Sequence, residues 1–147
     1  MVIPIKNSNF LMFLDEYQWD DSCLKIELTP DVVLLSSWEQ QDESSFYQIR
    51  PIITKLIDLG CKYFVCAGGY SEQLHDFIDD VIFNMSLSTG QGSITDIMTT
   101  WHDTDTNEEV ANFFLYSTNV SNSLLVAFLD ENRTEDRGLK KAILNLV

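Results

Sequence analysis

Ile97-Met98-Thr99-Thr100-Trp101-His102-Asp103-Thr104-Asp105-Thr106-Asn107-Glu108-Glu109 is the stretch that decides the fold. It starts as a buried apolar strand, continues into a polar, acidic turn and ends at the start of a helix. Thr106 followed by Glu109 matches a capping box, which marks a helix N-terminus. In α/β proteins, a turn that leads from the carboxyl end of a strand into a helix is where ligands bind.

The same strand-then-helix unit recurs along the chain. Apolar runs that suit strands covered on both faces lie at residues 32–35, 63–67, 97–101 and 124–129. Each is followed by apolar residues at helical spacing. Ser45 with Gln48 predicts the cap of the first helix, and Gly60 predicts its end. Pro51 suits the first turn of a helix, so the helix could instead start later than Ser45.

The later helix boundaries are predicted in the same way. The second helix should end before a loop at residues 84–93, which contains two glycines. Thr134 is the predicted N-cap of the last helix, whose buried side should include Ile143 and Leu146.

Four such alternations predict an α/β protein whose mainly parallel sheet has helices on both faces. That arrangement is a three-layer Rossmann-like or flavodoxin-like sandwich, with about four core strands plus an N-terminal edge strand. The chain of 147 residues has the size of a single domain. We expect residues 1–30 to form an edge or lid segment and residues 31–147 to form the repeated units.

Within the N-terminal segment, two patterns indicate local structure. Residues 10–14, with the sequence Phe-Leu-Met-Phe-Leu, are either a short strand or a turn of helix. Leu24, Ile26 and Leu28 alternate with charged residues, which is typical of a half-exposed strand.

The chain is strongly acidic, with a formal net charge of −14 from 23 acidic and 9 basic residues. This balance argues against binding to nucleic acid, because phosphate contacts need clustered Lys and Arg. It also argues against an anionic membrane surface, and no uncharged run suits a membrane span. A basic protein partner or simple solubility remains.

The charge is unevenly distributed, because residues 63–132 contain no Lys or Arg. The acidic residues of that span are Glu72, Asp76, Asp79, Asp80, Asp96, Asp103, Asp105, Glu108, Glu109, Asp130 and Glu131. They are either solvated helix faces or an acidic surface that steers a basic partner. For the second case, the candidate partner-binding residues are Glu72, Asp76, Asp79, Asp80, Glu108 and Glu109.

The three cysteines, Cys23, Cys61 and Cys66, have no metal-ligand spacing, and two of them flank or occupy a predicted buried strand. The first residues do not resemble a signal peptide. Both observations predict a location in the reducing cytoplasm.

The carboxyl ends of parallel strands share one edge of a sheet, so we expect the four strand exits to converge. The predicted crevice is acidic with aromatic walls. The candidate pocket residues are Trp38, Glu39, Gly68, Gly69, Tyr70, Trp101 and His102.

The side chains of that crevice suit either a metal site or purely structural roles. A divalent metal would need several carboxylate oxygens, for which the candidates are Asp103, Asp105, Asp130 and Glu131. His102 would then act as a nitrogen ligand or as a general base, with Asp103 beside it. In the alternative, Asp103 and Asp105 serve only the N-terminus of the following helix, and the protein has no catalytic residue, metal or cofactor.

The sequence does not match other catalytic or nucleotide-binding signatures. Gly68-Gly69 opens a helix, yet the surrounding residues match neither a dinucleotide fingerprint nor a P-loop. No nucleophile elbow is present, and no Cys–His pairing is evident.

Residues 98–102, with the sequence Met-Thr-Thr-Trp-His, are followed by an acidic spacer and by Glu108-Glu109. This pattern resembles a family of small uncharacterised bacterial proteins, a domain of unknown function. The resemblance extends from Asp31 to the C-terminus, although Gly69-Tyr70 departs from the Gly-acidic pattern of that family. It implies relatedness and no particular activity.

Three functions remain open at this point. The first is an acidic partner-binding protein, in concrete form an immunity or inhibitor protein that covers a basic toxin or nuclease. The second is a small metal-dependent enzyme or ligand sensor built around His102 and Asp103. The third is a structural accessory subunit that pairs through its apolar N-terminal segment.

Overall fold

The computed structural model describes residues 2–15, 28–89 and 96–147. Its strands are β1 (Val2–Pro4), β2 (Phe10–Leu14), β3 (Pro30–Ser36), β4 (Tyr63–Ala67), β5 (Met98–His102) and β6 (Leu124–Phe128). Its α-helices are α1 (Glu43–Tyr47), α2 (Arg50–Asp58), α3 (Ser71–Thr89), α4 (Asn107–Asn112) and α5 (Thr134–Leu146). A π-helical turn at Phe113–Ser117 continues α4.

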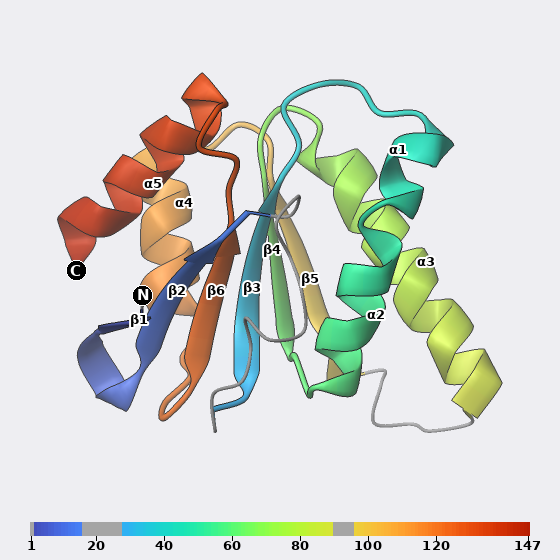
Figure 1. Cartoon of the computed structure of the whole chain (residues 1–147), viewed down its shortest axis with the longest axis horizontal. Coiled ribbons are helices and arrows are strands. Elements are labelled where there is room, and N and C mark those ends of the chain that lie inside the picture. The colour runs from blue at the N-terminus through green and yellow to red at the C-terminus, as the bar shows by residue number, and fades with distance from the viewer. Residues whose placement is uncertain (1, 16–27, 90–95) are drawn as a thin grey trace.

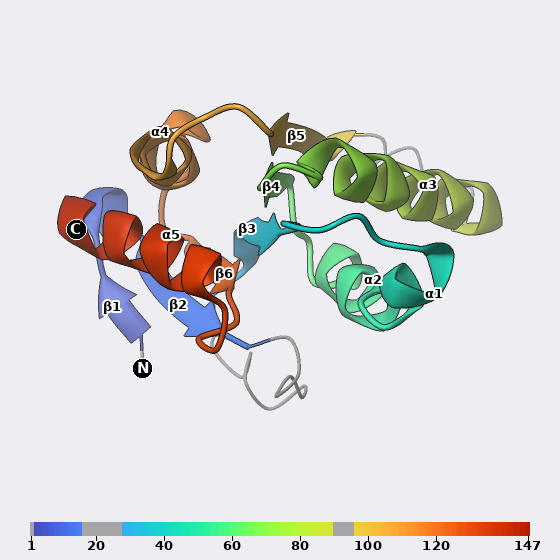
Figure 2. The same cartoon turned by 90° about the horizontal axis from the view of Figure 1, so that it is seen from above.

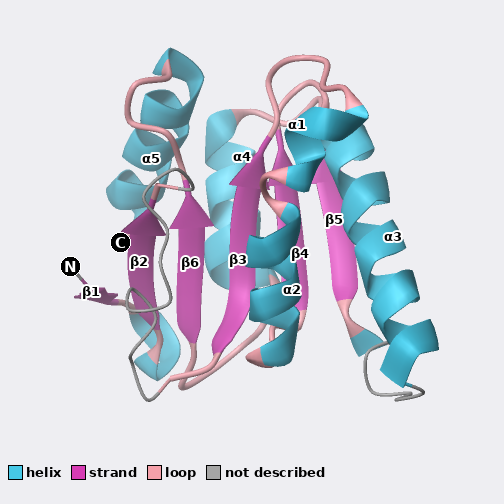
Figure 3. Ribbon diagram, turned by 45° about the vertical axis from the view of Figure 1, so that its right-hand side comes forward, coloured by secondary structure: helices cyan, strands magenta, loops and turns pink. Residues whose placement is uncertain are grey.

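The strands form a single sheet of six in the order β1-β2-β6-β3-β4-β5 (Figure 1). β1 runs antiparallel to β2, and the other neighbours are parallel (Figure 3). The expected mixed α/β protein with a mainly parallel sheet is therefore confirmed. The sheet has more strands than expected, because the N-terminal segment contributes two of them.

The helices lie on both sides of the sheet. Seen from above, α1, α2 and α3 lie on one side and α4 and α5 on the other (Figure 2). Alternate side chains of each strand face opposite ways, so the sheet supports two apolar cores. One joins Val33 and Phe64 to α2 and α3, and the other joins Leu34 and Val65 to α4 and α5.

The N-terminal segment is not a lid over the sheet in its described part. Phe10–Leu14 is strand β2, which lies between β1 and β6 and pairs in parallel with β6. The three-residue strand β1 forms the edge of the sheet on this side. The predicted strand around Leu24 and Ile26 lies outside the described residues, as do Trp19 and Cys23.

β5 is at the opposite edge and is less buried than its apolar sequence predicts. No residue of β5 is in the buried core, and Met98 at 51% and Trp101 at 44% exposure are the most open. The prediction of a buried strand is wrong here because β4 is its single strand neighbour among the described residues.

Several helix boundaries differ from those expected. Asp42, not Ser45, caps the first helix by accepting a hydrogen bond from the Ser45 backbone N–H at 3.0 Å. The expected single helix is divided into α1 and α2, because Pro51 lies in the first turn of α2. α2 ends at Asp58, and Gly60 follows at φ 97°, in the left-handed region, as predicted.

Among the last three helices, the boundaries of α3 and α5 differ from the prediction and the start of α4 agrees with it. α3 continues to Thr89, through most of the predicted loop, whose glycines lie outside the described residues. Thr134 is the first residue of α5 rather than its cap, and Leu146 is exposed at the C-terminal end of the helix. The predicted capping box of Thr106 and Glu109 is present.

None of the helices in the described ranges combines the length and apolar character that crossing a bilayer requires.

Candidate functional site

The edge strand β5 places its aromatic and histidine side chains on the two faces of the sheet. The pairing of β5 with β4 sets Trp101 beside Cys66, so Trp101 faces α3. His102 pairs with Ala67 and therefore faces α4. The two residues that are adjacent in the predicted pocket point to opposite sides of the sheet.

On the α3 side, Trp101 packs against His75. Their ring centroids are 4.5 Å apart with the planes at 58°. The His75 ring also contacts two carboxylates of its own helix, Asp76 at 3.0 Å and Asp79 at 3.3 Å. Both carboxylates are half exposed or more, so their remaining oxygen lone pairs stay available to a partner.

The outer face of α3 is acidic at its start and apolar at its end. Leu74, Ile78 and Val81 point into the core, so the residues roughly opposite them on the helix face solvent. Among these are the exposed Phe83 at 60% and Leu87 at 68%. We define the α3–β5 surface as Glu72, Asp76, Asp79, Asp80, Phe83, Leu87 and Trp101.

Two of the six predicted partner-binding residues lie elsewhere. Glu108 and Glu109 start α4, which covers the other face of the sheet (Figure 2). The Glu109 carboxylate already accepts the Thr106 backbone N–H at 3.1 Å in the capping box. The structure therefore brings together the four acidic residues of α3 and separates the two of α4.

His102 is held from three sides. Its Nδ1 lies 2.7 Å from the Asp105 carboxylate and its Nε2 lies 3.0 Å from the Thr100 hydroxyl. Its ring packs against Phe113 at 4.6 Å, and 9% of the side chain is exposed. Both nitrogens are engaged, and the carboxylate partner is Asp105 rather than Asp103.

The four carboxylates of the hypothesised metal site are not brought together. Asp103 and Asp105 follow β5, whereas Asp130 and Glu131 follow β6, and β3 and β4 lie between these strands. At about 4.8 Å per strand, the two exits are roughly 14 Å apart. Glu131 instead forms an ion pair with Lys140, which lowers the pKa of the Glu131 carboxyl. No cluster of three His, Cys, Asp or Glu side chains in the described ranges could hold a metal.

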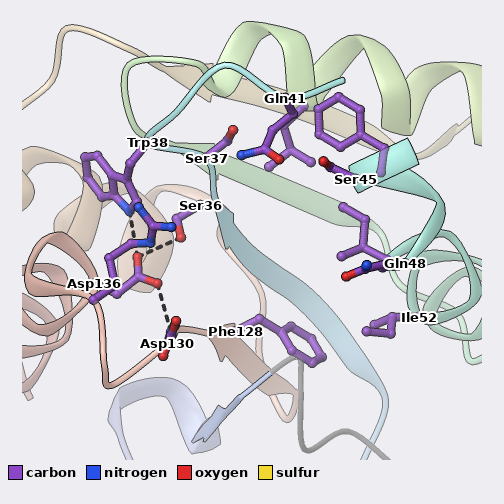
Figure 4. Close-up of a pocket in the computed structure, with 14 residues that line it drawn as sticks. Ser36, Ser37, Trp38, Gln41, Ser45, Gln48, Ile52, Phe128, Asp130 and Asp136 are labelled. Carbon is purple, nitrogen blue, oxygen red and sulfur yellow. Dashed lines mark hydrogen bonds between the residues drawn. The ribbon is translucent and has the colours of Figure 1, made fainter. Parts of the chain in front are cut away.

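A cavity of about 190 Å3 lies where β3 and β6 end (Figure 4). These strands are neighbours, but the chain leaves β3 toward α1 and leaves β6 toward α5, on opposite faces of the sheet. Of the predicted pocket residues, Trp38 lines this cavity. Glu39 lies beside it and accepts a hydrogen bond from Arg133 at 3.0 Å.

Asp136 is the central side chain of this cavity wall, and sequence reasoning missed it. It is 3% exposed. Its Oδ1 accepts the Ser36 hydroxyl and the Trp38 indole N–H, both at 2.7 Å, and its Oδ2 accepts the Asp130 backbone N–H at 2.8 Å. The one available signal was its place in the first turn of a helix, where carboxylates are common.

Gly68 fixes how the β3 and β4 exits pack. It adopts φ 103°, and a Cβ there would lie 2.3 Å from the Ser37 carbonyl oxygen and 3.2 Å from the Trp38 ring. The same Ser37 carbonyl accepts the Tyr70 backbone N–H at 3.1 Å. The glycine pair therefore serves a tight turn. Gly69 and Tyr70 are exposed and are not part of the cavity wall.

Arg133 is the cationic group of the cavity wall. Its hydrogen bond to Glu39 raises the pKa of the guanidinium, and the negative charges of Glu39, Asp136 and Glu135 act in the same direction. The guanidinium is therefore already paired with the Glu39 carboxylate.

The comparisons with known proteins give one match. A family model described as a domain of unknown function (DUF7684) matches residues 17–144. No curated protein and no solved structure matches the chain.

Proposed function

The chain belongs to the DUF7684 family, a domain of unknown function, and we propose that it is an acidic partner-binding protein that docks a basic protein on its α3–β5 surface. The observation that carries the proposal is the composition of the outer face of α3. Four carboxylates and two large exposed apolar side chains occupy this face beside β5, the edge strand of the sheet among the described residues.

Charge supports a basic partner. The surface lies within residues 63–132, which contain no Lys or Arg, so no cation of its own span offsets its carboxylates. Such a field accelerates the encounter with a positively charged protein and repels acidic competitors.

The apolar residues of the surface supply binding affinity that charge alone does not provide. Interfaces draw most of their affinity from a few aromatic or large apolar side chains surrounded by a polar rim. Trp101, Phe83 and Leu87 are such side chains, and the carboxylates of α3 precede Phe83 and Leu87 on the same outer face of the helix.

The concrete form that we propose is an immunity or inhibitor protein that covers a toxin or nuclease. Nucleases hold phosphates with Lys and Arg, and a row of carboxylates complements such a site. We place the protein in the cytoplasm, because Cys61 and Cys66 are free and buried. We also assign the sheet and its helices to the doubly wound, flavodoxin-like or Rossmann-like sandwich, on the helices seen on both sides of the sheet.

The alternative function has less support. A metal-dependent enzyme or ligand sensor around His102 and Asp103 would need an open histidine and neighbouring carboxylates. His102 is bonded at both nitrogens, and the carboxylates lie at separate exits.

The test compares two charge-reversed variants of equal net charge. The first carries Glu72→Lys and Asp80→Lys on the α3–β5 surface, and the second carries Glu108→Lys and Glu135→Lys on the other side of the sheet. Each exchanges two negative charges for two positive ones, which changes the formal charge from −14 to −10. Glu72 lies in the first turn of α3, and Glu108 and Glu135 lie in the first turns of α4 and α5, so the control variant loses at least as much favourable helix-dipole interaction as the surface variant.

The partner is first captured at low salt from the native host with the genomic neighbours expressed, then purified for kinetics. We expect a basic protein whose association rate falls about tenfold at high salt and in the first variant, but little in the second. Binding that is indifferent to salt, or equal loss in both variants, contradicts the proposal.

A further inference from the structure

The cavity between β3 and β6 has the position that α/β proteins use for small ligands. Neighbouring parallel strands whose connections leave toward opposite faces open a crevice at their carboxyl ends. Here β3 leads to α1 and β6 leads to α5, on opposite sides of the sheet (Figure 2). This crevice is separate from the α3–β5 surface and does not depend on the function proposed for it.

The geometry points to a binding site in this cavity for a small uncharged polyhydroxylated molecule of monosaccharide size. The cavity measures about 190 Å3, which is smaller than the roughly 300–1,000 Å3 of pockets for drug-sized ligands. Its lining supplies both hydrogen-bond donors and acceptors, as a polyol requires.

One wall of the cavity carries hydrogen-bond acceptors in fixed positions. Asp136 is locked by the Ser36 hydroxyl, the Trp38 indole and the Asp130 backbone N–H. A carboxylate offers about four lone-pair positions, and these three bonds leave one on Oδ2. The adjacent Asp130 side chain lines the same wall, so a ligand hydroxyl has rigidly placed acceptors.

The facing wall is built from neutral polar groups. Figure 4 shows Gln41, Ser45 and Gln48 across the cavity from Asp130 and Asp136. The backbone of Gln41 is fixed by the Gln73 amide, which donates to its carbonyl at 2.8 Å and accepts its N–H at 3.2 Å. Amides both donate and accept, as hydroxyls do.

The bottom of the cavity is apolar. Phe128 and Ile52 line it below the polar groups (Figure 4). Sugars and similar polyols have apolar C–H faces as well as polar edges, so they suit a cavity with both kinds of lining.

The charges disfavour an anion. The N-terminus of α5 is where a phosphate would bind, but the Asp136 carboxylate already occupies that region and accepts the Asp130 backbone N–H. Arg133, the cation of the wall, is paired with Glu39 at 3.0 Å. For a cationic ligand, the Asp136 carboxylate is already satisfied by three donors, and the Asp130 Oδ1 accepts the Asn132 backbone N–H. An uncharged ligand requires neither an unpaired cation nor an unsatisfied carboxylate in the wall.

The test follows the indole N–H signal of Trp38 in proton–nitrogen correlation spectra during titration with D-glucose and D-ribose. The chain has three tryptophans, and Trp38→Phe identifies the signal. Inorganic phosphate and spermidine serve as the anionic and cationic probes. Gln48→Ala removes an amide of the cavity wall, and Gln40→Ala removes a matched amide that is exposed and outside the cavity.

We expect a saturable shift of the Trp38 signal with a sugar, while the Trp101 signal stays unchanged. Gln48→Ala should weaken that binding about fivefold, the effect of one hydrogen bond, and Gln40→Ala should not. The inference is overturned if neither sugar moves the Trp38 signal, if phosphate or spermidine binds more tightly than the sugars, or if the two glutamine variants respond alike.

Discussion

Asp136 shows how a single side chain can organise two elements. Its carboxylate ties the end of β3, through Ser36 and Trp38, to the end of β6, through the Asp130 backbone. At 3% exposure the carboxylate has left water, so its hydrogen bonds must offset a large desolvation cost. Removal of the carboxylate leaves the three donors without an acceptor.

Asp136→Ala should lower the free energy of unfolding by about 2–4 kcal/mol. Each of the three donors left without a partner costs about 1–3 kcal/mol, and part of this is offset because the desolvation cost of the buried carboxylate disappears. Glu135→Ala is the matched control, since Glu135 is exposed in the same first turn. That change should cost less than about 1 kcal/mol, the usual size of a helix-dipole contribution.

Urea unfolding of both variants measures the difference. Asp136→Asn should fall between them, because its carbonyl oxygen still accepts. Equal losses for Asp136→Ala and Glu135→Ala would mean that the buried network contributes nothing beyond the dipole.

At the scale of elements, the turn between β4 and α3 holds the residues that follow β3 in place. The Ser37 backbone N–H continues the sheet by donating to the Ala67 carbonyl at 2.8 Å, and the Ser37 carbonyl accepts from Tyr70 at 3.1 Å. Gly68 lies between these two bonds. Its φ of 103° and its closeness to Ser37 together require the absence of a side chain.

Gly68→Ala should therefore lower the free energy of unfolding by more than about 1 kcal/mol, since a side chain is strained at this φ and would also collide with backbone. The matched change is Gly69→Ala, where a Cβ would meet nothing within 4 Å. Thermal and urea unfolding of the two variants should differ clearly, with Gly69→Ala close to the wild type. A Gly68→Ala protein as stable as Gly69→Ala would show that the turn has an alternative packing.

At the scale of the whole molecule, self-repulsion is the dominant electrostatic feature. The formal charge is −14. Two of the ion pairs in the described ranges, Arg133 with Glu39 and Lys140 with Glu131, lie at the surface, where such pairs contribute little. Screening by salt should relieve repulsion more than it weakens these pairs.

The melting temperature should accordingly rise with NaCl concentration. The rise should be smaller in the Glu72→Lys, Asp80→Lys variant, because that variant has less repulsion to screen. Calorimetry at a series of NaCl concentrations measures both. A melting temperature that falls as salt is added would mean that the ion pairs outweigh the repulsion.

Local sequence determined the elements whose causes are local. The apolar run of residues 32–35 predicted β3, Thr106 with Glu109 predicted the start of α4, and Gly60 predicted the end of α2, because periodicity and capping depend on residues a few positions apart. Asp42 shows where this reasoning was less accurate. It lies three residues before the predicted cap Ser45 in the same polar loop, and its side chain caps α1 instead.

The sequence by itself determined a mainly parallel α/β protein with an acidic span that lacks cations. Only the tertiary structure decided strand order, and strand order decides which exits meet. β3 and β6 adjoin, so Ser36, Trp38 and Asp136 form one wall although about 100 residues separate them. β5 is at the edge, so His102 and Asp103 lie apart from Asp130. Pairing between distant strands depends on the packing of the whole chain, which no local pattern encodes.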